Sequence, residues 1–265
     1  MQQPLNQYPS YSQEPLLSAQ SQRDHDSEEE VYANWRKYHS RFNHVLTNPN
    51  AEYGWNVFYE MIRQAVQGKR VLEIGCNTGY LSARIADYGA RYVLGTDISK
   101  EMIATANQTY AIPGTCEFAL HDATLPFDGK FDVIVGSAVL HHFAYQDALL
   151  HLERENLSAE GRMFFFEPLA SNLCMRLFRS FSKDAHTRDE CPFTRKDIRW
   201  MHKTFPNFML IPINYTSVPI GAFSSLLFKS ADNVLLRSAD GIDRFLAKHA
   251  SFLHTRFRCA ILSFQ

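Results

Sequence analysis

Short apolar runs alternate with helical patterns through the middle of the chain. The apolar runs cover 70–74, 92–96, 116–119, 131–136 and 162–166. Helical patterns lie between them near 79–88, 99–110 and 145–157. Strands that alternate with helices form βαβ units, whose parallel sheet is buried on both faces. The pattern therefore predicts an α/β fold.

The segment before these units differs in composition and periodicity. Residues 1–28 are rich in Gln, Ser, Pro and Tyr, and we expect a disordered tail there because they offer little apolar surface to bury. Ser27 and the three glutamates after it are typical of a helix start. The predicted helix carries an apolar stripe with three- and four-residue spacing, formed by Tyr32, Trp35, Tyr38, Phe42 and Val45. A second helix is predicted at 52–67.

The alternation becomes irregular after Pro168. A helix is predicted at 194–203, and the last two strands at 208–213 and 256–264. Long connections inside a domain usually serve a function. We therefore interpret 168–203 and 215–255 as lid elements over a core at about 52–167, all within one domain that spans 29–265.

Charge and composition narrow the class of protein. Lysine and arginine number 27 against 28 acidic residues, so the chain as a whole presents no field that would attract nucleic acid. The five cysteines are scattered and show no metal-ligand spacing. No signal peptide and no run of about 18 apolar residues is present. We expect a cytoplasmic protein without a metal site or a membrane span, and the oligomeric state stays open.

The strongest chemical signal is VLEIGCNTGYLS at 71–82, where an apolar strand runs into a loop and then a helix. Glycines at 75 and 79 allow a ligand to approach the backbone, and the amides of a helix N-terminus favour an anionic group. Asn77 stands where the dinucleotide-binding GxGxxG pattern has its second glycine, which disfavours a hydride-transfer enzyme.

This loop resembles the first motif of class I S-adenosylmethionine-dependent methyltransferases, which has an acidic residue, an apolar residue, a glycine, variable positions and a second glycine. The next strands continue the resemblance with GTDIS at 95–99, HDA at 121–123 and FDVIVGSAVLHHF at 131–143. The family resemblance implies a Rossmann-like, seven-stranded, mostly parallel sheet with an antiparallel edge. It also implies S-adenosylmethionine as the cofactor.

The resemblance also implies cofactor-binding roles for individual residues. Asp97 would bind the ribose hydroxyls, Ile98 would pack on the adenine, and Asp122 beside Ala123 would accept from the adenine amine. Ser137 would lie beside the methionine part. Tyr32 and Tyr38 belong to a helix that would close over the cofactor, or would simply dock on the sheet. The motif around the first strand and its loop adds five more predicted cofactor-binding residues, which are Glu73, Gly75, Cys76, Asn77 and Gly79.

Acid–base residues follow the fourth and fifth strands. His141 and His142 come directly after the fourth strand, and Glu167 ends the fifth. A histidine titrates near neutrality and suits general-base work. We expect at least one histidine to assist deprotonation of the acceptor. The alternative is that one histidine packs on a helix and the other binds a backbone carbonyl.

The sequence thus predicts methyl transfer to an oxygen, nitrogen or carbon atom of a small, largely apolar natural product or lipid-like acceptor. A protein methyltransferase and a catalytically silent binding module are the alternatives. The acceptor and its reacting atom are left open, because fold alone does not specify function.

Overall fold

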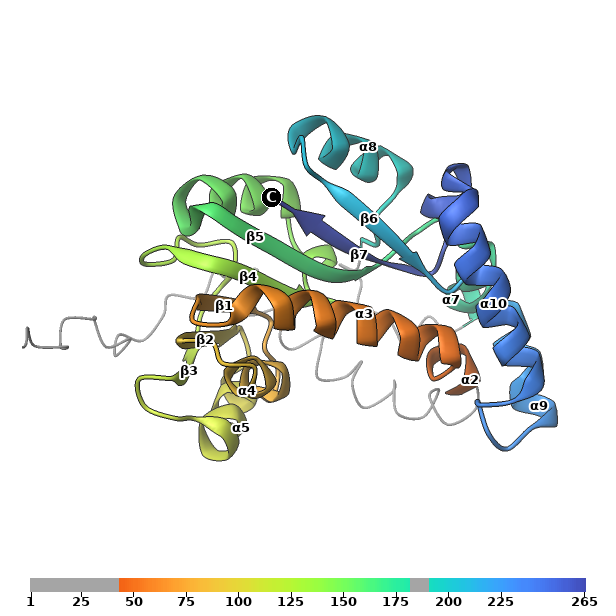
Figure 1. Cartoon of the computed structure of the whole chain (residues 1–265), viewed down its shortest axis with the longest axis horizontal. Helices are drawn as coiled ribbons and strands as arrows, with labels where there is room; N and C mark the ends of the chain where they lie inside the picture. Colours follow the sequence, from red (N-terminus) through yellow and green to blue (C-terminus); the bar gives the residue numbers. More distant parts are fainter. Residues whose placement is uncertain (1–42, 182–190) are drawn as a thin grey trace, which may run out of the picture.

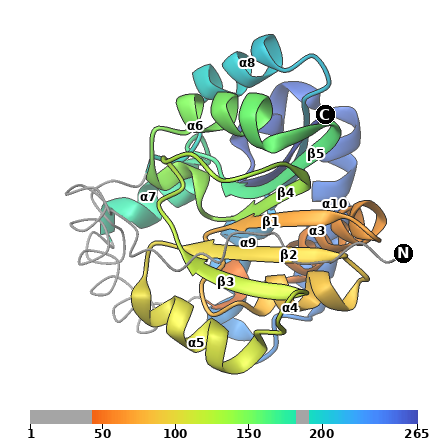
Figure 2. The ribbon, with the colours of Figure 1, turned by 90° about the vertical axis from the view of Figure 1, so that its left-hand side faces the viewer.

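The computed structural model describes residues 43–181 and 191–265. Its centre is a seven-stranded sheet in the order β3-β2-β1-β4-β5-β7-β6. The strands are β1 (Arg70–Ile74), β2 (Tyr92–Asp97), β3 (Cys116–Leu120), β4 (Phe131–Ser137), β5 (Leu157–Pro168), β6 (Met209–Ile213) and β7 (Cys259–Phe264). β1 to β5 pair in parallel, whereas β7 is antiparallel to β5 and β6. Figure 2 shows the strands from β3 to β5 in this order. The predicted seven-stranded, mostly parallel α/β fold is confirmed.

Helices cover both faces of the sheet (Figure 1). They are α2 (Asn43–Leu46), α3 (Pro49–Val66), α4 (Tyr80–Asp87), α5 (Lys100–Tyr110), α6 (Tyr145–His151), α7 (Leu173–Phe181), α8 (Arg195–Thr204), α9 (Ser217–Leu227) and α10 (Val234–His249). Short helical turns are η1 (Leu140–His142), η2 (Leu152–Asn156) and η4 (Ser251–Arg256). The described part of the chain contains no helix that is long and apolar enough to cross a membrane.

Alternate residues of each central strand face opposite cores, because side chains in a strand alternate between the two faces. Val71 and Val133 face a core that contains Phe58 of α3 and apolar residues of α4 and α5. Leu72 and Ile134 face the other core, which includes residues of α6 and α8. The apolar runs are continuous because both faces of the sheet are buried.

The strand order places a switch point between β1 and β4. The chain passes outward from β1 through β2 to β3 and then returns to β4 on the other side of β1. In open α/β sheets, ligands bind at the carboxyl ends of the strands beside such a reversal. The loops that follow β1, β2 and β4 are therefore the first place to look for a site.

The segment 168–203, predicted as a lid element, contains α7 and α8. α8 packs across one face of the sheet, and Ile198 and Met201 are buried in the same core as Phe165 and Phe264. This helix follows the usual βα packing rule because its apolar stripe fits the uncovered sheet face between α6 and the edge. α7 follows the carboxyl end of β5.

Two predicted boundaries also shift. The strand expected from residue 162 begins at Leu157, since η2 ends the preceding helix early and the register with β4 is irregular between Phe131 and Val133. The strand expected from 256 begins at Cys259, because 251–256 forms a short helical turn. The predicted tail at 1–28 lies outside the described residues.

Candidate functional site

The glycine loop after β1 has a backbone that only certain residues adopt easily. Gly75 and Gly79 have φ values of 66° and 85°. Asn77 has φ 49°, a left-handed conformation that asparagine tolerates better than most residues. Asparagine can therefore stand where the family often has glycine without changing the turn. Its amide nitrogen points toward the end of β2.

Asp97, the last residue of β2, joins two loops. One carboxylate oxygen accepts a hydrogen bond from the Asn77 amide at 2.8 Å, and the other accepts from the Ser99 amide at 2.9 Å. The backbone of Cys76 donates to the carbonyl of Thr96 at 2.9 Å, which ties the same strands together. Burial raises the pKa of the Cys76 thiol, so this cysteine stays a neutral core residue. The carboxylate of Asp97 is thus oriented by the protein itself.

The ends of β3 and β4 are connected to this pair of loops. The His121 amide donates to the Asp97 carbonyl at 3.0 Å, which brings the residues after β3 to the end of β2. On the other side, a Cβ placed on Gly75 would lie 2.6 Å from a methyl carbon of Val139. Gly75 is therefore required for the loop after β4 to pack on the loop after β1.

A buried acid–base pair holds the loop after β4. Glu167, fully buried at the end of β5, accepts from the amides of Val139 and Leu140 through Oε1, each at 2.9 Å. Its Oε2 lies 2.8 Å from Nδ1 of His141, a residue that is only 5% exposed. The His142 ring lies against the His141 ring, with centroids 4.1 Å apart. The structure thus brings all three predicted acid–base residues together.

Backbone strain concentrates at the same edge. Ala138 has φ 53° directly after β4, and Asn214 has φ 62° directly after β6. With Asn77 after β1, these are the non-glycine residues with positive φ in the described part of the chain. Such conformations cost of order 1–3 kcal/mol each and gather where a site requires a particular backbone.

Glu73 lies beneath the glycine loop. It is buried and accepts a hydrogen bond from the hydroxyl of Ser82 on α4. Burial, which removes water from the charged form, raises the pKa of Glu73 to about 8, and the nearby Asp97 charge acts in the same direction. Glu73 therefore holds α4 against β1 with its carboxyl group protonated near neutral pH.

This raised pKa predicts a pH-dependent stability. The ordinary value is 4.5, so between pH 4.5 and 8 the folded chain holds a proton that the unfolded chain has lost. The stabilising contribution of the protonated Glu73 carboxyl is fully present below pH 4.5 and is lost as the pH rises through 8. Relative to Glu73→Gln, the free energy of unfolding of the wild-type protein should fall by about 1.4 kcal/mol per pH unit in this window. Urea unfolding of both proteins at pH 5 to 8 measures this difference, and parallel curves would contradict it.

The remaining predicted cofactor residues lie at the same sheet edge. Asp122 is buried and accepts from the Thr124 amide at 2.9 Å and from its hydroxyl at 2.6 Å. Ile98, Ala123 and Ser137 are half-buried, directly after β2, after β3 and at the end of β4. Tyr32 and Tyr38 lie outside the described residues.

Sequence reasoning missed the residues that support the site. Ser82 and Thr124 hold Glu73 and Asp122, and Val139 fills the space over Gly75. Ser99, whose amide donates to Asp97, could have been found from the sequence, because a serine directly before a helical pattern is a signal for a helix N-cap. Val139 gave no such signal because its role depends on the pairing of β1 with β4.

The sheet order and the connected loops at its carboxyl edge define a Rossmann-like α/β domain. Residues 72–163 match a family model described as a methyltransferase domain. The chain is 29% identical to the ribosomal protein L11 methyltransferase of Lactobacillus gasseri over 150 residues, which is 51% of this chain and 46% of that protein. It is 26% identical to the ubiquinone biosynthesis O-methyltransferase of Neisseria meningitidis over 105 residues, 38% of this chain and 44% of that one. The chain thus spans about half the length of these relatives.

Solved structures share the fold over nearly the whole chain. The N-methyltransferase NodS from Bradyrhizobium japonicum, solved with S-adenosylhomocysteine, superposes with a TM-score of 0.54. It is 15% identical, and the match covers 90% of this chain and 95% of that one. Residues 72–163 thus resemble a methyltransferase domain, and the chain shares the fold of NodS.

Proposed function

We propose that the chain transfers the methyl group of S-adenosylmethionine to an oxygen, nitrogen or carbon atom of a small, largely apolar acceptor. The observation that carries the proposal is the packing of Val139 on Gly75. It sets the loop that holds the Glu167–His141 pair beside the glycine loop. A cofactor loop next to an oriented acid–base group is the arrangement that methyl transfer with proton removal requires.

The residues at the sheet edge fit the cofactor. A Cβ at Gly75 or Gly79 would collide with Val139 or Phe118, so the loop requires glycine at both positions. α4 begins at Gly79 without a hydrogen bond from a capping side chain, and a carboxylate such as that of the methionine part would satisfy its first amides. When bound, S-adenosylmethionine supplies an electrophilic methyl group on a sulfonium centre.

The acidic residues at the strand ends would bind the nucleoside part. Asp97, which two amides already orient, would accept hydrogen bonds from the ribose hydroxyls. Asp122 would receive the adenine amine, with Ile98 and Ala123 against the ring. Glu73 would act through Ser82 and α4, because it is buried below the loop.

His141 is the proposed general base. With Glu167 ionised, Nδ1 of His141 carries the proton that it donates to Oε2, so Nε2 is left with the accepting lone pair. Nε2 would take a proton from the acceptor atom as it attacks the methyl group. Glu167 is a positioning residue in this scheme, since three donors occupy its two oxygens and no part of it is exposed.

The choice of a small apolar acceptor rests on the helices beside the site. α7 and α9 follow the carboxyl ends of β5 and β6, and they expose the large apolar side chains of Leu173, Phe223 and Leu226. Exposed apolar clusters commonly mark binding surfaces. The similarity to a ubiquinone biosynthesis O-methyltransferase supports such an acceptor. The similarity to a ribosomal protein L11 methyltransferase favours a protein acceptor as the second candidate.

The test is formation of S-adenosylhomocysteine by the purified protein. Apolar phenols, amines and activated carbon acids form one acceptor panel, and ribosomal proteins form the other. Turnover above the acceptor-free rate with the small molecules alone is the expected result. Turnover with the proteins alone would transfer the assignment to the second candidate. Cofactor binding without turnover on either panel, which defines a silent module, or a preference for NAD would contradict the proposal.

A further inference from the structure

A cavity lies at the edge of the sheet formed by β6, away from the glycine loop. Its volume is about 640 Å³, and it opens between α8, β6 and η4. β1 and β6 are separated by β4, β5 and β7, so the cavity lies roughly 19 Å across the sheet from the cofactor loop at about 4.8 Å per strand. We call it the basic groove, and it is lined by Arg195, Ile198, Arg199, His202, Leu210, Ser251, Phe252, His254 and Thr255.

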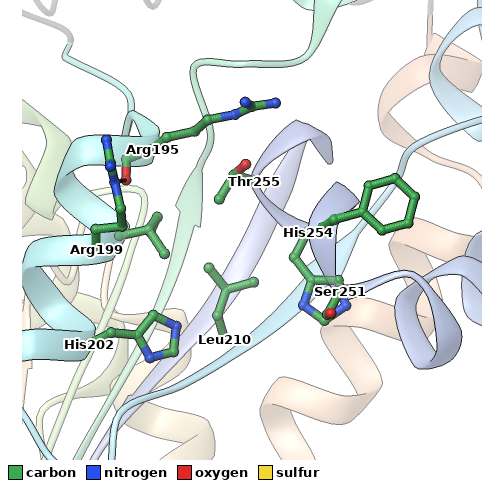
Figure 3. Close-up of a pocket in the computed structure, with 9 residues that line it drawn as sticks. Arg195, Arg199, His202, Leu210, Ser251, His254 and Thr255 are labelled. Atoms are coloured by element: carbon green, nitrogen blue, oxygen red, sulfur yellow. Dashed lines mark hydrogen bonds between the residues drawn. The ribbon is translucent and has the colours of Figure 1, made fainter.

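The groove concentrates positive charge. Arg195, Arg199 and His202 follow one another at four- and three-residue spacing, which puts them on one face of α8. His254 faces them from η4, and no acidic residue lines the cavity. Figure 3 shows the Arg195 and His202 side chains extending from α8 toward the 251–256 segment. The net charge of −1 for the whole chain therefore conceals a locally basic site.

The acidic residue on α8 does not neutralise this face. Asp197 accepts from the amide and hydroxyl of Thr194, each at 2.7 Å, and from the hydroxyl of Tyr145, also at 2.7 Å. These bonds direct it toward α6 and the helix start. Within residues 43–181 and 191–265, neither Arg195 nor Arg199 forms an ion pair.

Several basic side chains are held in place before any ligand binds. Nε of Arg199 donates to the Arg195 carbonyl at 3.2 Å. Nε2 of His254 donates to the Ala247 carbonyl at 2.7 Å, which leaves Nδ1 for another partner. The His202 ring packs edge-on against Phe208, with centroids 4.7 Å apart. A guanidinium group that is already held loses less conformational entropy when it binds an anion.

We infer that the basic groove binds a small organic phosphate. Arg195 and Arg199, on successive turns of α8, both line the groove, and guanidinium groups pair well with the oxygens of a phosphate monoester. The hydroxyls of Ser251 and Thr255 add donors. Ile198 and Leu210 form an apolar floor, and the ring of Phe252, which is 76% exposed, offers a stacking surface for an organic part. The volume lies within the range of about 300–1,000 Å³ that is typical of small-molecule sites, which favours such a ligand over a macromolecule.

Calorimetric titration with phenyl phosphate at low ionic strength tests this inference. The double variant Arg195→Ala/Arg199→Ala should raise the dissociation constant by at least about tenfold, because charge-assisted hydrogen bonds are lost. Phe252→Ala should weaken phenyl phosphate while leaving inorganic phosphate unchanged. The matched control is Arg63→Ala/Arg237→Ala, which removes two exposed arginines elsewhere and should bind like the wild-type protein.

Titration of every variant with S-adenosylhomocysteine reports the state of the fold and the cofactor site independently. Unchanged S-adenosylhomocysteine affinity together with lost phenyl phosphate binding supports the inference. Absence of phenyl phosphate binding to the wild-type protein, or equal binding to the double variant, would overturn it. Binding of a phosphoserine peptide or a short RNA in place of phenyl phosphate would overturn the small-molecule assignment.

Discussion

Replacing Asp97 with asparagine should raise the dissociation constant for S-adenosylmethionine roughly 100-fold, because a charged acceptor for two ribose hydroxyls becomes a neutral amide. Asparagine also has a single acceptor oxygen, whereas Asn77 and Ser99 each donate to a different oxygen of Asp97. One backbone amide would then face an amino group. We expect the free energy of unfolding to fall by about 1–3 kcal/mol as well.

Calorimetry with S-adenosylmethionine and urea unfolding measure the two effects of this change. The matched control is Asp87→Asn, which alters an exposed carboxylate at the end of α4 and should change neither quantity. Loss of stability with unchanged cofactor affinity would show that Asp97 only braces the loops. That result would remove Asp97 from the cofactor site.

His141→Gln should lower kcat by about 10²- to 10⁴-fold, the usual contribution of a general base, with cofactor affinity changed by only a few fold. Glu167→Gln should have a similar effect on kcat through a different route. Its amide group would face Nδ1 of His141 and would favour the tautomer with the proton on Nε2, which removes the accepting lone pair. A pH–rate profile distinguishes loss of the base from a general loss of fold, because only loss of the base changes the pH dependence of the rate.

His142→Gln is the control for this pair, since its ring lies against the His141 ring, whereas the Glu167 carboxylate lies 2.8 Å from Nδ1 of His141. We expect a loss of less than tenfold. A larger loss in His142→Gln than in His141→Gln would reverse the assignment between the two histidines. Full activity in the double alanine variant would remove both histidines from the mechanism.

Much of the site could be placed from the sequence because of one property of parallel sheets. The carboxyl ends of all parallel strands meet at one edge, so residues at strand ends are neighbours in space even when they are far apart in the chain. Asp97 and Asp122 could therefore be placed at one edge of the sheet, because they lie at the end of β2 and directly after β3. The structure places the loops that carry them in contact through Asn77 and His121.

The segment after β5 could not be interpreted in the same way. The sequence around α8 has an amphipathic pattern that suits a lid as well as a covering layer, and only the position of the uncovered sheet face decides between them. The groove beside α8 was missed for the same reason. Arg199 and His254 are 55 positions apart, and net charge summed over the chain hides their juxtaposition.

The sequence by itself determined the alternation of strands and helices, the glycine loop, and the acidic residues at the ends of β2 and β5 and after β3. These features are local, because hydrophobic periodicity and turn chemistry act over a few residues. Only the tertiary structure decided that Glu167 binds His141, that Val139 closes over Gly75 and that α8 belongs to the core. Each of these depends on which strands pair and which faces of the sheet remain to be covered. Such long-range contacts cannot be predicted from a local sequence pattern.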